Sequence, residues 1–143
     1  METKRAPVSA SDAADRQRQI LGDLAVEHGR QLGQILRARE LLKGAVYQKQ
    51  TRCGKPGCYC AQPRGRPHPA TVLCWSEAGR TRMRCLPLEE RARVRGLTEQ
   101  YRSLRQARAA LVRLQPQILR AIDDLAEALR RPPPAAASRR PRG

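Results

Sequence analysis

The chain lacks the residues from which large hydrophobic cores are built. Its 143 residues include no Phe, one Trp and three Tyr, so we expect a modest core that a metal ion or a partner chain supplements. No apolar run approaches the roughly 20 residues that a membrane span needs. The first 19 residues also lack the apolar stretch of a secretory signal. We therefore expect a cytoplasmic protein without a membrane partner, in which thiols stay reduced.

Acidic residues are also scarce. The chain has 13 Asp and Glu against 29 Lys and Arg, which gives a net charge of +16. The excess is concentrated between Lys49 and Arg113, where 15 basic residues face only four Glu. Such a field attracts polyanions, and DNA or RNA is the obvious candidate. The alternative is a solvated surface of an Arg-rich protein, since 25 of the 29 basic residues are Arg.

The most informative segment reads CGKPGCYCAQPRGRPH, from Cys53 to His68. Three cysteines and one histidine, namely Cys53, Cys58, Cys60 and His68, are spaced C-x4-C-x-C-x7-H among turn-forming residues. Because the segment has little apolar material to hold it, a metal is the natural organiser, and thiolates with an imidazole select zinc. Four protein ligands would close the site, which predicts a structural zinc ion. The alternative is a reduced loop without metal.

Groups typical of enzymes are missing. Paired carboxylates occur only as Glu89-Glu90 and Asp123-Asp124, and no phosphate-cradling glycine loop is present. Catalysis by the zinc ion would need an open coordination position, which would exist only if His68 were not a ligand. We therefore expect a protein that is not an enzyme.

Hydrophobic periodicity and turn residues predict one domain over residues 12–131. Its predicted parts are a helix over 12–43, a zinc loop over 53–68, a hairpin over 71–86 and a long helix over 89–130 that kinks near Pro116. A lead of residues 1–11 and a basic, Pro-rich tail of residues 132–143 are expected to be disordered.

The hairpin is predicted to turn at Ala78-Gly79, which pairs Trp75 with Arg82 and places Cys74 and Cys85 on one face as diagonal neighbours. Free cysteines commonly behave as small hydrophobes, so we expect both to be buried. A role as a fifth metal ligand or as a redox pair stays open. For Trp75 we favour packing on the core over stacking on a base.

The long helix carries two rows of residues at heptad spacing. One row is wholly Leu or Ile: Leu97, Leu104, Leu111, Ile118 and Leu125. The other contains Val94, Tyr101, Arg108, Gln115, Ile122 and Leu129. The pattern indicates a coiled-coil seam in which Arg108 and Gln115 fix the register. The seam would also allow self-association or the docking of a partner protein through residues 89–130.

A set of basic residues surrounds the predicted zinc loop and hairpin. A zinc-pinned head that carries such a patch suits contact with a phosphate backbone. The predicted nucleic-acid-binding residues are Lys55, Arg64, Arg66, Arg80, Arg82, Arg84, Arg91 and Arg95.

The stretch LLKGAVYQKQTRCGKPGCYCA, followed by His68 and a short hairpin, resembles a family of small uncharacterised bacterial and archaeal proteins. Its members carry a CGKPxCxCA signature and then a histidine, and the resemblance covers residues 40–115. It departs at Pro69-Ala70, where the family has Gly-Pro and aromatic residues, so base stacking on this strand is less expected. Members are frequently encountered near transposase-type genes, which implies an accessory role in a mobile element.

Together these features predict a mainly α-helical fold with a small β-hairpin, in which two long helices pack as an antiparallel, coiled-coil-like pair with a zinc-pinned hairpin head. The expected function is a non-enzymatic, zinc-stabilised nucleic-acid-binding module, with DNA favoured over RNA, accessory to a transposase or recombinase. One alternative is a protein-interaction adaptor with a structural zinc head, whose coiled coil docks another chain and whose positive charge meets an acidic partner. A second is a thiol redox protein that loses its metal on oxidation.

Overall fold

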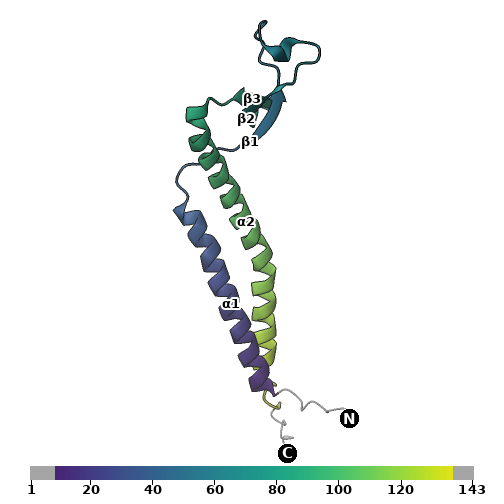
Figure 1. Cartoon of the computed structure of the whole chain (residues 1–143). Helices are drawn as coiled ribbons and strands as arrows, with labels where there is room; N and C mark the ends of the chain where they lie inside the picture. Colours follow the sequence, from purple (N-terminus) through teal and green to yellow (C-terminus); the bar gives the residue numbers. More distant parts are fainter. Residues whose placement is uncertain (1–8, 137–143) are drawn as a thin grey trace, which may run out of the picture. The chain divides into compact units, whose positions relative to one another are not determined.

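The computed structural model describes residues 9–136, and Figure 1 shows the order of its elements. They are helix α1 (Ala10–Arg37), strand β1 (Ala45–Thr51), the short 3-10 helix η1 (Tyr59–Ala61), strands β2 (His68–Glu77) and β3 (Arg80–Cys85), and helix α2 (Leu88–Leu129). The strands form one antiparallel sheet in the order β1-β2-β3. The predicted mainly α-helical fold with a small β element is therefore confirmed.

The described residues fall into two compact units. Unit 1 is formed by residues 9–30 and 110–136, and unit 2 by residues 31–109. Unit 2 contains the whole sheet and the loop between β1 and β2, whereas unit 1 is built from the first part of α1 and the second part of α2. The prediction of a single domain over residues 12–131 stays a prediction.

Helix α1 begins earlier and ends earlier than the predicted helix over 12–43. It begins at Ala10 because the Asp12 backbone N–H donates to the Ser9 hydroxyl oxygen at 3.1 Å, which is the bond of an N-terminal cap. Residues 10 and 11 of the predicted disordered lead are therefore helical. The helix ends at Arg37 because the segment after it bonds elsewhere: the Leu42 backbone N–H donates to the Leu97 carbonyl at 3.1 Å.

Residues 1–8 of the predicted lead, and residues 137–143 of the predicted tail, lie outside the described residues. The described part of the tail, residues 132–136, has no regular secondary structure. Among residues 9–136, no helix is both long and apolar enough to cross a membrane.

The predicted hairpin forms with the predicted register. Trp75 pairs with Arg82 and Cys74 with Met83, and the turn lies at Ala78-Gly79. Both turn residues have positive φ, 50° at Ala78 and 76° at Gly79, as a two-residue turn between twisted strands requires. β1 is a third strand that the sequence did not predict. Its residues AVYQKQT carry only a short apolar start, and pairing with β2 along seven residues holds the strand in place.

A small core lies between the sheet and the start of α2. Leu73, Leu86 and Val94 are buried there, and Leu42, Val46 and Trp75 pack against them. Burying a side chain of this size contributes about 1.5–3 kcal/mol, so three such residues make the modest core that the composition predicts. The interpretation of Trp75 as a packing residue is confirmed, and its indole N–H donates to Glu77 at 3.4 Å.

The interpretation of both hairpin cysteines as buried hydrophobes is wrong for Cys85. Cys74 lies on the central strand β2 and is half-buried, whereas Cys85 is exposed. The reason is that β3 is an edge strand whose six residues are all exposed. Both thiols are free.

The two helices run antiparallel within each unit. In unit 1, Ala14 near the start of α1 shares a surface pocket with Ala128 and Leu129 at the end of α2. In unit 2, Arg37 at the end of α1 shares a pocket with Leu97 and Gln100 in the first part of α2. The predicted antiparallel pairing of the two helices is consistent with both arrangements.

The Leu/Ile row of α2 is half-buried along its length, but its role as a coiled-coil seam stays a prediction, and the second predicted row is wrong beyond Tyr101. Arg108, Gln115, Ile122 and Leu129 are exposed, and the buried residues are instead Ala107, Leu114 and Ala121. These three lie three residues after Leu104, Leu111 and Ile118. The physical reason is that this row buries only apolar groups, whereas the predicted row would have buried an Arg and a Gln.

Helix α2 continues through Pro116 as one element. Proline has no backbone N–H, so the Val112 carbonyl lacks its usual helical donor. The carbonyl of the next residue, Arg113, accepts a hydrogen bond from the Gln117 side-chain amide at 3.1 Å. The helix is continuous on both sides of Pro116.

Candidate metal centre

The sheet brings the two ends of the cysteine loop together. Thr51, the last residue of β1, pairs with His68, the first residue of β2. Cys53 follows β1 by two residues, so it lies close to His68 although 15 positions separate them in the sequence. Figure 1 shows the loop extending from these strand ends, with η1 inside it. The strand pairing that the sequence did not predict therefore closes the predicted metal loop.

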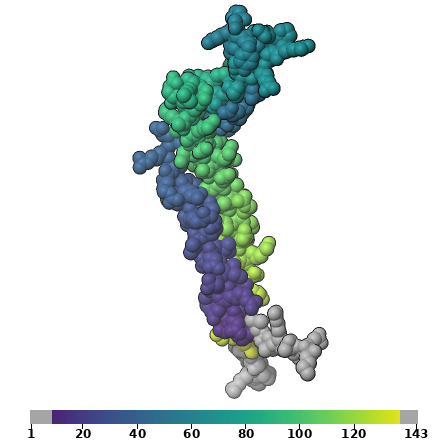
Figure 2. Space-filling model, viewed as in Figure 1, coloured from purple at the N-terminus to yellow at the C-terminus, as the bar shows by residue number. Residues whose placement is uncertain are grey.

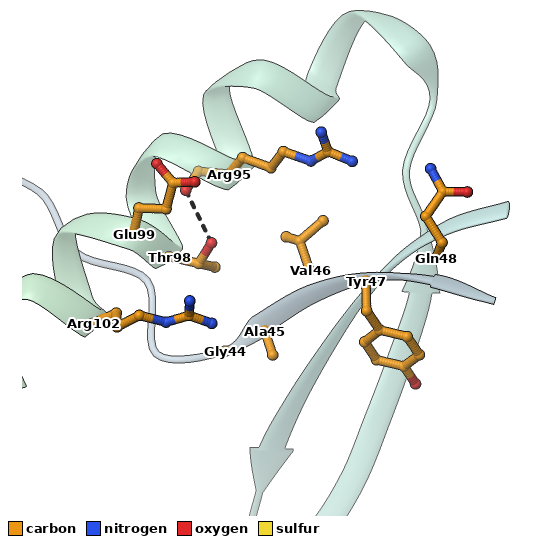
Figure 3. Close-up of a pocket in the computed structure, with 9 residues that line it drawn as sticks. All are labelled: Gly44, Ala45, Val46, Tyr47, Gln48, Arg95, Thr98, Glu99 and Arg102. Carbon is orange, nitrogen blue, oxygen red and sulfur yellow. Dashed lines mark hydrogen bonds between the residues drawn. The ribbon is translucent and has the colours of Figure 1, made fainter.

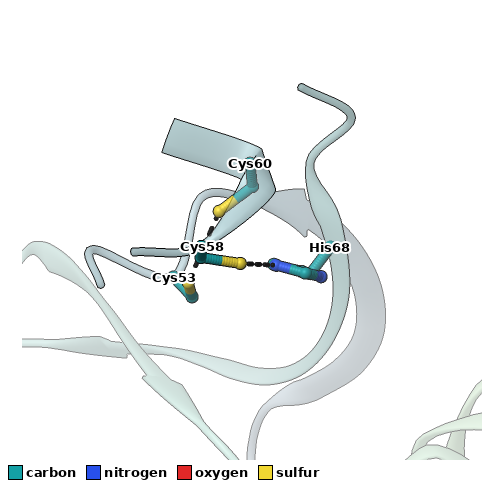
Figure 4. Close-up of side chains that lie close together, drawn as sticks. All are labelled: Cys53, Cys58, Cys60 and His68. Atoms are coloured by element: carbon teal, nitrogen blue, oxygen red, sulfur yellow. Dashed lines mark hydrogen bonds between the residues drawn. The ribbon is translucent and has the colours of Figure 1, made fainter. Parts of the chain in front are cut away.

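The four predicted ligands meet at one point (Figure 4). The sulfur atoms of Cys53 and Cys60 lie 3.4 Å apart, and the Cys58 sulfur lies 3.0 Å from His68 Nε2. All four ligand atoms lie within 4.8 Å of one another. Tetrahedral zinc with its ordinary bond lengths separates its ligand atoms by about 3.5–3.8 Å. The residues are therefore close enough to hold a metal ion.

Burial differs among the four ligands. Cys60 is fully buried, Cys58 and His68 are half-buried, and Cys53 is exposed. The centre thus has one side closed by protein and one side at the surface. Cys74 and Cys85 do not belong to the cluster, so the structure gives neither of them the place of a fifth ligand.

Backbone N–H groups act directly on two of the thiols. The pKa of Cys53 is lowered, first by a hydrogen bond from the Lys55 backbone N–H and then by the contact with Cys60. For Cys60 the largest effect is a hydrogen bond from the Cys53 backbone N–H, which lowers its pKa. Burial and the neighbouring thiols of Cys53 and Cys58 outweigh that bond and raise the pKa of Cys60 above its ordinary value. Cys53 is therefore the more readily ionised of the two.

Two residues that sequence reasoning missed shape the loop around Cys60. The Arg52 guanidinium donates to the Cys60 carbonyl and, at 3.4 Å, to the Gln62 carbonyl, so it ties η1 to the end of β1. Gly65 lies against the same turn: a Cβ there would overlap the Tyr59 carbonyl oxygen and come within 2.8 Å of the Cys60 Cα. The glycine in the Arg-Gly-Arg stretch was the available signal, but only the folded loop shows what it contacts.

Tyr59 packs against the candidate ligand His68. Its ring meets the His68 imidazole edge to face, with centroids 5.1 Å apart and planes at 76°. This contact packs one side of the imidazole while Nε2 faces the Cys58 sulfur. The residue between the second and third cysteines thus helps to orient the fourth ligand.

The structure divides the predicted basic set in two. Arg82 pairs with Glu77 at 3.8 Å, Arg84 pairs with Glu90 at 3.2 Å, and Arg91 donates to the Leu86 carbonyl at 3.1 Å. The remaining side chains make no hydrogen bond or ion pair within residues 9–136: Lys55, Arg64, Arg66, Arg80 and Arg95. The exposed cations of the loop are therefore available to an external anion, whereas Arg91 in particular has a structural partner.

A protein-family model matches residues 13–96, more than half of the chain. The chain belongs to the family described as a domain of unknown function, DUF6788. The matched region contains most of α1, the whole sheet, the four clustered residues and the start of α2. The expected membership in a family without an assigned function is confirmed. No curated protein and no solved structure matches the chain.

Proposed function

We propose that this DUF6788 chain is a non-enzymatic nucleic-acid-binding module whose head, the loop of residues 52–67 with the three-stranded sheet, is stabilised by one structural zinc ion. The observation that carries the proposal is the meeting of three thiols and one imidazole within 4.8 Å. Thiolate and imidazole ligands favour zinc over calcium or magnesium. Four protein ligands fill a tetrahedral shell, which leaves no position for a reacting water.

The charge of the head supports a nucleic-acid partner. Lys55, Arg64 and Arg66 are exposed on the loop and have no partner within the described residues. In the space-filling view the loop projects from the rest of unit 2 (Figure 2), so these cations can approach a phosphate backbone without rearrangement. Arg and Lys contacts of this kind supply most of the affinity of non-specific binding. DNA is the favoured partner, in an accessory role to a transposase or recombinase.

A protein-interaction adaptor is the second candidate, and a specific observation favours it. The unit 1 part of α2 exposes large apolar side chains, with exposures of 59% at Val112, 51% at Leu119, 47% at Ile122 and 51% at Leu129. They recur at helical spacing and could pack against a further helix. Binding through this face would persist at high salt because it is mainly apolar.

The test is a titration of the zinc-loaded full chain, freed of nucleic acid, with a fluorescent DNA duplex and the equivalent RNA. Measurements at about 50 and 200 mM salt span the range in which phosphate contacts lose affinity steeply. The proposal predicts salt-sensitive binding that Arg64→Ala with Arg66→Ala weakens on every sequence. Arg113→Ala with Arg120→Ala, which removes the same charge from unit 1, is the matched control and should have a smaller effect. Absence of binding to both probes at low salt would reject the nucleic-acid function in favour of the adaptor.

A further inference from the structure

A cavity of about 310 Å³ lies in unit 2 between the start of β1 and helix α2 (Figure 3). Residues 44–48 at the start of β1 line one side, and Arg95, Thr98, Glu99 and Arg102 of α2 line the other. Its size lies at the lower end of the range of small-ligand sites, which begins at about 300 Å³. It therefore suits a small group or one group of a larger ligand.

The cavity has two arginines with no partner. Arg95 and Arg102 are seven residues apart, so they project from the same face of α2. Figure 3 shows both guanidinium groups directed toward β1, while the carboxylate of Glu99, which lies between them in the sequence, points away from the strand. Neither arginine forms an ion pair or hydrogen bond through its side chain within residues 9–136. The two cations therefore face the cavity together.

The β1 side of the cavity adds hydrogen-bond donors but no further charge. β1 is an edge strand that pairs only with β2, so alternate backbone N–H groups on its outer side are without a strand partner. The Gln48 carboxamide stands on the same side of β1 as Val46 and lies across the cavity from Arg95 (Figure 3). The Thr98 hydroxyl is already used, since it donates to the Arg95 carbonyl at 3.0 Å. The unsatisfied groups are thus guanidinium and amide donors.

We propose that this cavity binds one phosphate group of a nucleic-acid backbone, held between Arg95 and Arg102. Guanidinium forks match the oxygens of phosphate and bind them in pairs. The proposal rests on the proposed function and extends it, because it adds Arg102 and the β1 edge to the contact surface.

The first test compares Arg102→Ala with Arg105→Ala in the zinc-loaded full chain, using the DNA duplex as the probe. Arg105 is exposed on the same helix and does not line the cavity. Losing one phosphate contact should reduce the slope of log K against log salt by about 1. We expect that change for Arg102→Ala, a smaller one for Arg102→Lys, and none for Arg105→Ala. Circular dichroism and zinc content, unchanged in all three variants, verify that folding is intact.

One outcome would reject the phosphate site in the cavity but leave the proposed function in place. In that outcome Arg102→Ala has unaltered affinity and salt slope, whereas the double variant Arg64→Ala with Arg66→Ala binds DNA more weakly. If the unmodified chain does not bind DNA, the proposed function itself is rejected.

A second arm separates backbone phosphate from free phosphate. Inorganic phosphate is titrated into the chain while the backbone amide resonances of residues 44–48 are followed by NMR, and the DNA duplex is then added. Shifts of these resonances by DNA, lost in Arg102→Ala, support the proposal. Shifts by inorganic phosphate that DNA neither reproduces nor displaces would overturn the backbone assignment.

Discussion

Gly65 lies so close to η1 that the backbone of that turn occupies the space where a side chain would begin. A Cβ added at Gly65 would overlap the Tyr59 carbonyl oxygen and crowd the Cys60 Cα. Both are backbone atoms, which cannot move without displacing Cys60, one of the four candidate ligands. Cys60 is also the only fully buried ligand of the cluster. We therefore expect the candidate metal centre to be sensitive to a residue that contributes no ligand atom.

We expect Gly65→Ala to lose zinc almost completely, because it displaces the turn that presents Cys60. The matched control is Gly57→Ala, at a position where an added Cβ meets nothing within 4 Å. Zinc content after dialysis, measured by a colorimetric chelator, compares the two variants. Equal zinc content in both would show that the turn can yield and that our view of this loop is wrong.

Cys58→Ala removes a ligand outright. Its sulfur is the one next to His68 Nε2, so the variant should retain less than about a tenth of the zinc of the unmodified chain, since three of four ligands make a poor structural site. Cys85→Ala, at an exposed cysteine outside the cluster, should leave zinc content unchanged. Full zinc occupancy in Cys58→Ala, measured by elemental analysis, would refute the ligand assignment.

At the scale of elements, sequence patterns predicted the features that residues close together in the chain determine. The hairpin register followed from the Ala78-Gly79 turn, and the ligand cluster followed from residue types within one short segment. β1 and the end of α1 could not be predicted because tertiary hydrogen bonds fix them, such as that between Leu42 and Leu97. The same applies to the second buried row of α2, where the small residues Ala107 and Ala121 are buried and the predicted polar residues are exposed.

Pro116 is expected to lower the stability of helix α2 locally. It is exposed and sits in the helix interior, where proline is less favourable than alanine by up to about 3 kcal/mol. We expect Pro116→Ala to stabilise the chain and to raise Tm by roughly 5–10 °C. Thermal unfolding followed by circular dichroism at 222 nm measures the change. An unchanged or lower Tm would mean that the proline is needed for the packing of α1 on α2.

At the scale of the whole molecule, the sheet and the helices have support that does not depend on the loop. The core of unit 2 consists of Leu73, Leu86 and Val94, none of which lies in the loop of residues 52–67. The family match ends at residue 96, so the remainder of α2 lies beyond the matched region. Basic charge is concentrated around the loop and hairpin, whereas the unpartnered apolar side chains of the adaptor hypothesis lie on α2 in unit 1.

Removal of zinc should therefore loosen the head selectively. We expect a chelator to abolish protection from trypsin cleavage after Arg64, which precedes Gly65, while the helical circular dichroism signal changes little, because metal binding and loop folding are coupled. DNA affinity should fall in parallel, and added zinc should restore both properties. Cooperative loss of the helices on chelation would show that the metal stabilises the entire fold rather than its head.

The most direct test of the zinc-stabilised head is the metal content and coordination of the full chain, purified without chelator and freed of nucleic acid. Native mass spectrometry gives the stoichiometry, and X-ray absorption at the zinc edge gives the ligands. The account predicts one zinc per chain, bound by three sulfur atoms at about 2.3 Å and one nitrogen at about 2.0 Å. A chain that binds no zinc, or binds it with fewer than three sulfur ligands, would contradict it.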